Sequence, residues 1–213
     1  MIVIINSYNR LPMLKKVVSA WLKSGAEVHI MDDGSDFEPL DGVTWHSFKH
    51  KGKRNYWQIW DYTLRMLRNM PQHEMIVFTP DDFTKPNIKR IISQHERLKR
   101  NPYAFNIIND GRVMCWNNFM PRVIDPQLLE VGFVDCGFFC NRLALDTLGY
   151  YISEPPTNWT DNHQSSGVGY QITNRMMRKG VSMLLPTKSL ATHGTHESKM
   201  HPEERKINPL QSQ

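Results

Sequence analysis

The stretch MIVIINSYNRLPMLKKVVSAWLKSGAEVHIMDDGSD, residues 1–36, decides the fold. Its opening run, 1–6, is short, apolar and rich in β-branched residues, which predicts a buried strand. Residues 11–25 carry apolar side chains at helical spacing, with a proline in the first turn and a glycine at the end. Residues 26–36 predict a second strand that runs into an acidic turn. A strand, a helix and a strand in this order indicate two parallel strands with the helix packed across them.

The alternation of strands and helices continues through most of the chain. Further strands are predicted at 42–48, 73–82 and 181–186, and further helices at 53–70, 86–100, 142–149 and 170–180. Short strands that can pair antiparallel are predicted at 103–109, 112–117 and 122–126. This order predicts a single α/β domain over 1–213, with a mostly parallel central sheet covered by helices on both faces.

Composition narrows the classes of function. Of the 213 residues, 40% are hydrophobic, so the chain can bury a core and is not expected to be disordered. No apolar run approaches the roughly 18 residues of a membrane span, and residues 1–5 lack the basic flank of a signal peptide. Cys115, Cys136 and Cys140 have no paired zinc spacing, which indicates a reducing compartment. We therefore expect a cytoplasmic protein without integral membrane contact, and its net charge of +5 favours anionic partners.

Three charged turns follow predicted strands: NSYNR at 6–10, MDDGSD at 31–36 and TPDDF at 79–83. Ligands of open α/β sheets bind at the carboxyl ends of the strands, so these turns are expected to face one crevice. They would gather four carboxylates there: Asp32, Asp33, Asp81 and Asp82. Such a cluster needs positive charge, and Mn²⁺ or Mg²⁺ bridging to phosphates is one source. The alternative for each aspartate is a turn or helix cap.

Several of these motifs resemble those of family 2 glycosyltransferases with the GT-A fold, a three-layer α/β/α, Rossmann-like fold. The likeness begins with SYNR and DDGS in the first 36 residues and continues through GKRNYWQIWDYTL (52–64) and VFTPDDF (77–83). DCGFFCNRLALDTLGYY (135–151) and YQITNRMMRKGVSMLLP (170–186) resemble the family's acceptor-side strand and late elements. The resemblance divides the chain into a nucleotide-sugar-binding half, an acceptor-side half and a polar tail, at about 1–100, 101–191 and 192–213. The tail is expected to form loop or short helix.

The resemblance also implies roles for individual residues. Tyr8 would stack on the base of the donor, Asn6 would contact the base, and Asp33 would accept a hydrogen bond from a base N–H group, as uracil offers. Arg54 would meet the base or the diphosphate. Asp82 would bind the metal ion, with Asp81 close to the ribose or the metal. The implied nucleotide-binding set is completed by Arg10 and Asp32.

Two features of the later chain bear on catalysis. Many GT-A enzymes place a late histidine on the metal or phosphate, and His193 and then His196 are the candidates, although a solvated polar tail is the alternative. Inverting members carry an acidic pair before the late helix, but the aligned stretch SSGVGYQITNR has no acid. A general base would then be Asp161 or Asp135, unless the anomeric configuration is retained and no base is needed.

The sequence therefore predicts a metal-dependent glycosyltransferase that moves a sugar from a nucleotide sugar, with a UDP-sugar favoured, to a hydroxyl acceptor. A basic run at 49–54 and a basic face over 89–100 favour DNA with a hydroxymethylated base as one acceptor. A saccharide, a lipid-linked compound or a protein is the alternative acceptor. A nucleotidyltransferase and a non-catalytic nucleic-acid-binding module are the competing classes, and the absence of glycine from NSYNRLP argues against the former.

Overall fold

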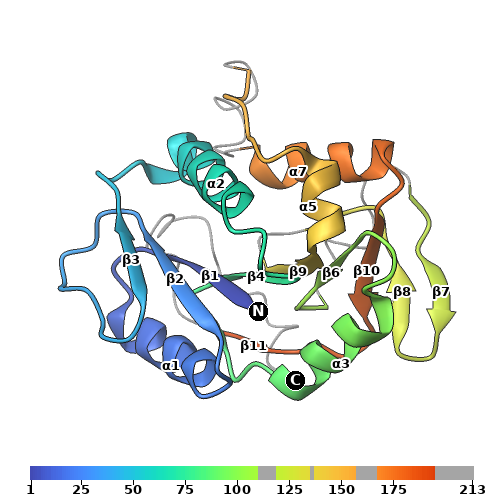
Figure 1. Cartoon of the computed structure of the whole chain (residues 1–213), viewed down its shortest axis with the longest axis horizontal. Helices are drawn as coiled ribbons and strands as arrows, with labels where there is room; N and C mark the ends of the chain where they lie inside the picture. Colours follow the sequence, from blue (N-terminus) through green and yellow to red (C-terminus); the bar gives the residue numbers. More distant parts are fainter. Residues whose placement is uncertain (110–118, 135–136, 157–166, 195–213) are drawn as a thin grey trace.

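The structure is a computed structural model that describes residues 1–109, 119–134, 137–156 and 167–194 (Figure 1). Its centre is a nine-stranded sheet with the strand order β3-β2-β1-β4-β9-β6-β10-β8-β7. The strands are β1 (Ile2–Ser7), β2 (Glu27–Asp32), β3 (Thr44–Ser47), β4 (Met75–Pro80), β6 (Tyr103–Asn106), β7 (Arg122–Asp125), β8 (Leu128–Glu130), β9 (Phe138–Asn141) and β10 (Ser182–Pro186). The helices of the described part are α1 (Leu11–Leu22), α2 (Gly52–Arg68), α3 (Ile88–Leu98), α5 (Arg142–Leu148) and α7 (Val168–Arg178).

The sheet is mixed, but most of its strands run the same way. β1 pairs parallel with both β2 and β4, and β2 pairs parallel with β3. β9 lies antiparallel between β4 and β6, and β8 lies antiparallel between β10 and β7. Because β6 and β10 are parallel to each other, only β8 and β9 oppose the other seven strands of the nine. The predicted α/β class with a mostly parallel sheet is confirmed at this level.

Helices cover both faces of the sheet: α1 and α3 lie on one face, and α2, α5 and α7 lie on the other (Figure 1). Side chains of a strand alternate between the two faces of the sheet, so a fully buried strand contributes residues to the hydrophobic core on each face. In β1, Ile2 and Ile4 join the core under α2, α5 and α7, whereas Val3 and Ile5 join the core under α1 and α3. This explains why β1 is apolar from Ile2 to Ile5 and becomes polar only at its last two residues, Asn6 and Ser7, where the turn begins.

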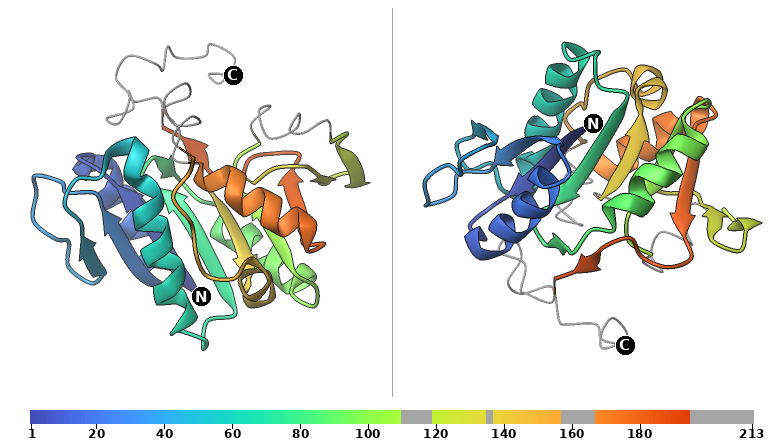
Figure 2. Two further views of the ribbon diagram at one scale, coloured as in Figure 1. Left: turned by 90° about the horizontal axis from the view of Figure 1, so that it is seen from above. Right: turned by 60° about the horizontal axis from the view of Figure 1, so that its bottom comes forward.

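Three short strands of the structure were not predicted: β5 (Phe83–Thr84), β8 and β11 (Thr192–His193). β8 joins β7 to β10, and the expected strand at 112–117 lies outside the described residues. β5 and β11 form a separate two-stranded antiparallel sheet. The expectation of loop or short helix from residue 192 is therefore wrong for its first two residues. Figure 2 shows the chain returning from β10 to reach β5.

None of the helices in the described part of the chain combines the length and the apolar character that crossing a bilayer requires.

Candidate functional site

Polar residues converge where β1, β2 and β4 end. In the parallel register, Asn6 lies beside Met31 of β2 and Pro80 of β4, and Ser7 lies beside Asp32. The turns that follow these three strands are therefore neighbours at one edge of the sheet. Two hydrogen bonds tie β1 to the β4 turn: Ser7 Oγ donates to Asp81 Oδ2 at 2.9 Å, and the Asp81 backbone N–H donates to the Asn6 carbonyl at 3.1 Å.

The positive group beside the paired carboxylates is Arg10, which lies just before α1. Its Nη2 is 2.7 Å from Asp81 Oδ1, and its Nη1 is 2.7 Å from Asp82 Oδ2. The side chains of Asp81 and Asp82 are 0% and 4% exposed, so the guanidinium contacts both carboxylates in a place that bulk water does not reach. A buried charge is tolerated only when it is paired, and Arg10 supplies the pairing for both aspartates.

Burial and pairing separate the acidities of the two aspartates. Burial raises the pKa of Asp81 to about 7, although the charge of Arg10 opposes this rise. Burial also acts to raise the pKa of Asp82, but its contacts with His193 and Arg10 outweigh it and hold the pKa below its ordinary value. Asp82 is therefore the carboxylate that stays ionised at neutral pH, as a metal ligand must.

β11 brings His193 onto the same carboxylate. His193 pairs with Phe83 in the small sheet, and its Nε2 lies 3.5 Å from Asp82 Oδ2. The next residue, Gly194, donates its backbone N–H to the Asp82 carbonyl at 2.7 Å. A Cβ at Gly194 would lie 2.3 Å from Met13 Cε and 3.2 Å from the Asp82 carbonyl oxygen, so a larger residue here would have to displace the Met13 side chain.

The donors of this cluster fit a hard divalent cation in part. Asp82 Oδ1 is buried and has no hydrogen-bond partner among the described residues, although such atoms are normally satisfied. The His193 imidazole, whose Nε2 lies 3.5 Å from the other oxygen of this carboxylate, Oδ2, provides a nitrogen ligand close by. Within the described ranges, no group of three or more His, Cys, Asp or Glu side chains is arranged to hold a metal ion. A Mg²⁺-type ion commonly uses one or two protein carboxylates and completes its shell with phosphate oxygens and water.

The carboxylates of Asp32 and Asp33 accept hydrogen bonds from the turns and the helix start beside them. The Asp32 carboxylate accepts from both the N–H and the hydroxyl group of Ser35, which closes the acidic turn. Asp33 accepts from the backbone N–H groups of Lys51 at 2.6 Å and Gly52 at 3.1 Å, at the start of α2. Burial raises the pKa of Asp33, and these two N–H groups and His50 oppose the rise. For this pair, the structure therefore shows the cap interactions that the sequence left open as the alternative.

An aromatic pair lies beside this cap. The Tyr8 ring stacks on the His50 ring, with centroids 4.3 Å apart and planes inclined by 19°. His50 Nδ1 lies 3.0 Å from the Asp33 carbonyl oxygen and 3.1 Å from Asp33 Oδ2, which fixes the imidazole against the turn. His50 was not among the predicted site residues. Its place in the basic run KHKGKR, directly before α2, was the signal that could have found it.

The remaining predicted residues divide into two groups. Arg54 lies exposed in the first turn of α2, and Asn6 is buried at the end of β1. The two candidate general bases and the second candidate histidine lie outside the described residues: Asp135, Asp161 and His196.

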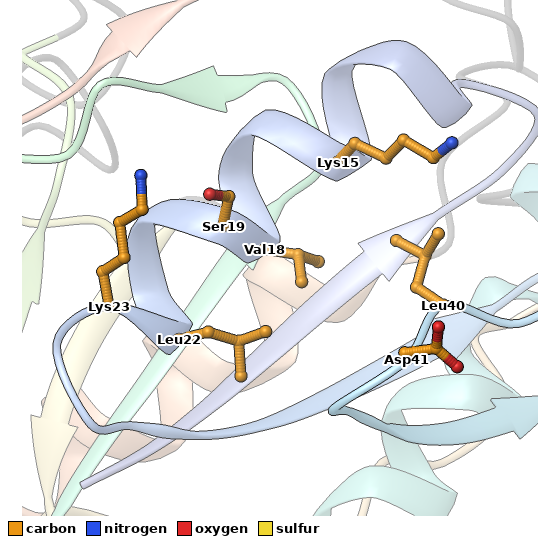
Figure 3. A pocket seen from close by; sticks show the side chains of 7 residues that line it. All are labelled: Lys15, Val18, Ser19, Leu22, Lys23, Leu40 and Asp41. Atoms are coloured by element: carbon orange, nitrogen blue, oxygen red, sulfur yellow. The ribbon is translucent and has the colours of Figure 1, made fainter.

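A shallow pocket of about 310 Å³ lies elsewhere, along the outer side of α1 (Figure 3). It is lined by Lys15, Val18, Ser19, Leu22, Lys23, Leu40 and Asp41, none of which belongs to the carboxylate cluster.

Comparison with known proteins gives no family assignment, because no family model matches the chain and no curated protein is significantly similar to it.

Proposed function

We propose that this chain is a metal-dependent glycosyltransferase with a GT-A fold, which moves a sugar from a nucleotide sugar to a hydroxyl acceptor. The favoured donor is a UDP-sugar, and the favoured metal ion is Mn²⁺ or Mg²⁺. The observation that carries the proposal is Oδ1 of Asp82, which has no hydrogen-bond partner in the part of the chain that the structure describes. This buried and ionised oxygen lies at the carboxyl ends of the strands, where ligands of α/β sheets bind.

The metal ion would be held by Asp82, with His193 as the second protein donor. When bound, such an ion neutralises charge on the leaving nucleoside diphosphate. Arg10 keeps the Asp82 carboxylate in place, because it holds Oδ2, while Oδ1 has no partner within the described ranges. Ser7 and Arg10 engage the two oxygens of Asp81, which precedes Asp82 directly after the end of the same strand, β4.

The donor base would stack on the aromatic pair formed by Tyr8 and His50. A flat base gains from such a surface whatever its hydrogen-bonding pattern. Asp33 lies behind this pair with both oxygens engaged by backbone N–H groups, and the residue is 1% exposed. A base N–H group would therefore reach Asp33 only after a shift of residues 50–52, so we assign the main base contact to Tyr8 and His50.

The acceptor is a compound with a free hydroxyl group, and DNA with a hydroxymethylated base and soluble glycans are the first two to assay. Ordinary thymine and cytosine offer no hydroxyl nucleophile on the base. Three residues of the basic face on α3 already have partners: Arg97 with Asp125, Lys99 with Glu96, and Arg90 with Gln127. Soluble glycans should therefore be assayed as acceptors on the same footing as DNA.

The direct test measures the nucleotide released from several nucleotide sugars in the presence of Mn²⁺, with and without acceptor. We expect slow release from UDP-sugars alone and loss of release in EDTA. Asp82→Asn should abolish release and Mn²⁺-dependent UDP binding, because it removes the ionised ligand while keeping its shape. Asp41→Asn changes an exposed carboxylate on the α1 pocket and serves as the matched control. Full activity in EDTA, or in Asp82→Asn, would contradict the proposal.

A further inference from the structure

The two oxygens of the Asp82 carboxylate have different surroundings. Oδ2 accepts from Arg10 Nη1 at 2.7 Å and faces His193 Nε2 at 3.5 Å. Oδ1 is buried and has no hydrogen-bond partner among the described residues. The guanidinium therefore fixes the rotation of the carboxylate and leaves one defined oxygen for a ligand. In the absence of Arg10, the carboxylate could turn either oxygen, or both, towards a cation.

The charges of the cluster also nearly cancel. Arg10 contributes one positive charge 2.7 Å from each carboxylate, Asp82 contributes a full negative charge, and Asp81 contributes at most one, all with little solvent between them. In such a place the attraction for a divalent cation depends strongly on the net charge, because water screens it only weakly. One carboxylate oxygen without a partner among the described residues, and a net charge no more negative than −1, make a poor site for a metal ion alone. A diphosphate adds both oxygen ligands and negative charge.

We propose that Arg10 is an internal counter-ion that makes metal binding depend on the nucleotide, and that it positions Asp82 Oδ1 for that ion. The inference rests on the proposed function and adds to it a way in which the nucleotide regulates metal binding. The free protein holds its carboxylates on Arg10 and binds a divalent cation weakly. A nucleoside diphosphate supplies the missing ligands and charge, so metal and nucleotide bind together.

The contact pattern distinguishes this role from that of an ordinary structural ion pair. A planar guanidinium that bridges two adjacent carboxylates fixes both of them, which the point charge of a lysine cannot do. A purely structural ion pair would affect stability when removed, but it would leave the balance between metal and nucleotide binding unchanged.

The experiment measures Mn²⁺ binding directly, from the decrease of the free-ion signal in electron paramagnetic resonance, with and without UDP. For the unmodified chain we expect Mn²⁺ affinity to be at least about tenfold higher with UDP than without it. Arg10→Gln should bind Mn²⁺ alone about tenfold more tightly than the unmodified chain, because the counter-ion is gone. Its dependence on UDP should shrink accordingly. Arg10→Lys keeps the charge and should restore the dependence on UDP.

Two further variants keep the test decisive. Arg65→Met removes an exposed arginine that pairs with Asp61 and should leave Mn²⁺ binding unchanged. Asp81→Asn lowers the net negative charge and should weaken Mn²⁺ binding in the presence of UDP, which provides a second reading if Arg10→Gln does not fold.

The possible outcomes separate the two proposals. If the unmodified chain does not bind Mn²⁺ and UDP together, the proposed function fails. If it does so, but Arg10→Gln binds Mn²⁺ alone no better than the unmodified chain, the role of Arg10 is overturned. With Arg10→Gln unfolded, unchanged binding in Asp81→Asn overturns it equally.

Discussion

Asp81 and Asp82 follow each other at the end of a buried strand, and one guanidinium makes this arrangement possible. Adjacent buried carboxylates repel each other, and the cost appears as the raised pKa of Asp81, which burial brings to about 7. Arg10 contacts both and lowers that cost. At the scale of single residues, the site therefore contains the Arg10 cation beside an ionised carboxylate, one oxygen of which has no partner among the residues that the structure describes.

Tyr8 provides the prediction at this scale. Tyr8→Ala should weaken UDP binding by about 1–3 kcal/mol, or roughly five- to 150-fold in the dissociation constant, because a base loses its stacking surface. Tyr8→Phe keeps the ring and should stay within about threefold of the unmodified chain. Isothermal titration calorimetry with UDP and Mn²⁺ measures both variants. Equal affinity in Tyr8→Ala would mean that the base binds elsewhere.

At the scale of elements, a chain of polar side chains joins β2, β3 and α2 on the face that α2 covers. Tyr62 of α2 lies 3.0 Å from His46 Nδ1, and His46 Nε2 lies 3.0 Å from His29 Nδ1. His29 Nε2 and His73 Nε2 lie 2.8 and 2.9 Å from the two oxygens of Glu27. One N–H group on each of the three imidazoles satisfies three of these contacts, and the Tyr62 hydroxyl donates to His46 Nδ1 in the fourth, so the network is complete with every histidine neutral.

This row of hydrogen-bonded side chains predicts that the protein loses stability in mild acid. Burial lowers the pKa of His46, and His29 adds to the shift, while burial also lowers the pKa of His73. A histidine in the unfolded chain has a pKa of about 6.5, so protonation below this pH favours the unfolded state. The stability contributed by neutral His46 is thus present above about pH 6.5 and is lost as the pH falls towards its lower folded-state pKa.

The measurement is the free energy of unfolding in urea at about pH 7.5 and about pH 5.5. His46→Gln should lose less stability between the two values than the unmodified chain, by a few tenths to about 1 kcal/mol. The comparison with the variant is needed because the raised pKa of Asp81 acts in the opposite sense over this range. The prediction is contradicted if the free energy of unfolding falls by the same amount in His46→Gln and in the unmodified protein.

At the scale of the whole molecule, the net charge of +5 attracts polyanions, but part of the basic surface is internally paired. Arg97 and Arg100 lie at the end of α3 that leads into the start of β6, whereas Asp82 lies where β4 ends. Since β4 and β6 run the same way, these arginines lie towards the opposite edge of the sheet from the carboxylate cluster.

DNA binding tests the importance of this surface. A protein that neutralises about four phosphates loses roughly 100-fold in affinity between about 50 and 200 mM salt, because counterions are released. We expect such a decrease for duplex DNA in gel-shift titrations. We also expect weaker binding in the double variant Arg97→Glu and Arg100→Glu, with UDP binding unchanged. If DNA neither binds nor accepts sugar on a hydroxymethylated base while a glycan does, the basic face is a solvated surface.

The sequence by itself determined most of the helices and longer strands, and the edge of the sheet where the polar turns lie. Hydrophobic periodicity is local, so the buried run of β1, the helix after it and the second strand could be read directly. Parallel neighbours end at the same edge, so the turns after β1, β2 and β4 had to be close. What the sequence left open was the partner of each carboxylate.

Only the tertiary structure decided those partners, because each contact joins segments that are far apart in the chain. Arg10 meets Asp82 across the β1–β4 pair, and β11 carries His193 to Asp82 through a strand of only two residues. So short a strand has no periodicity to detect. The cap of α2 by Asp33 depends on the path of residues 48–52, which local propensity does not specify. The same four carboxylates could be counted in the sequence, but their division between backbone caps and a ligand site required the fold.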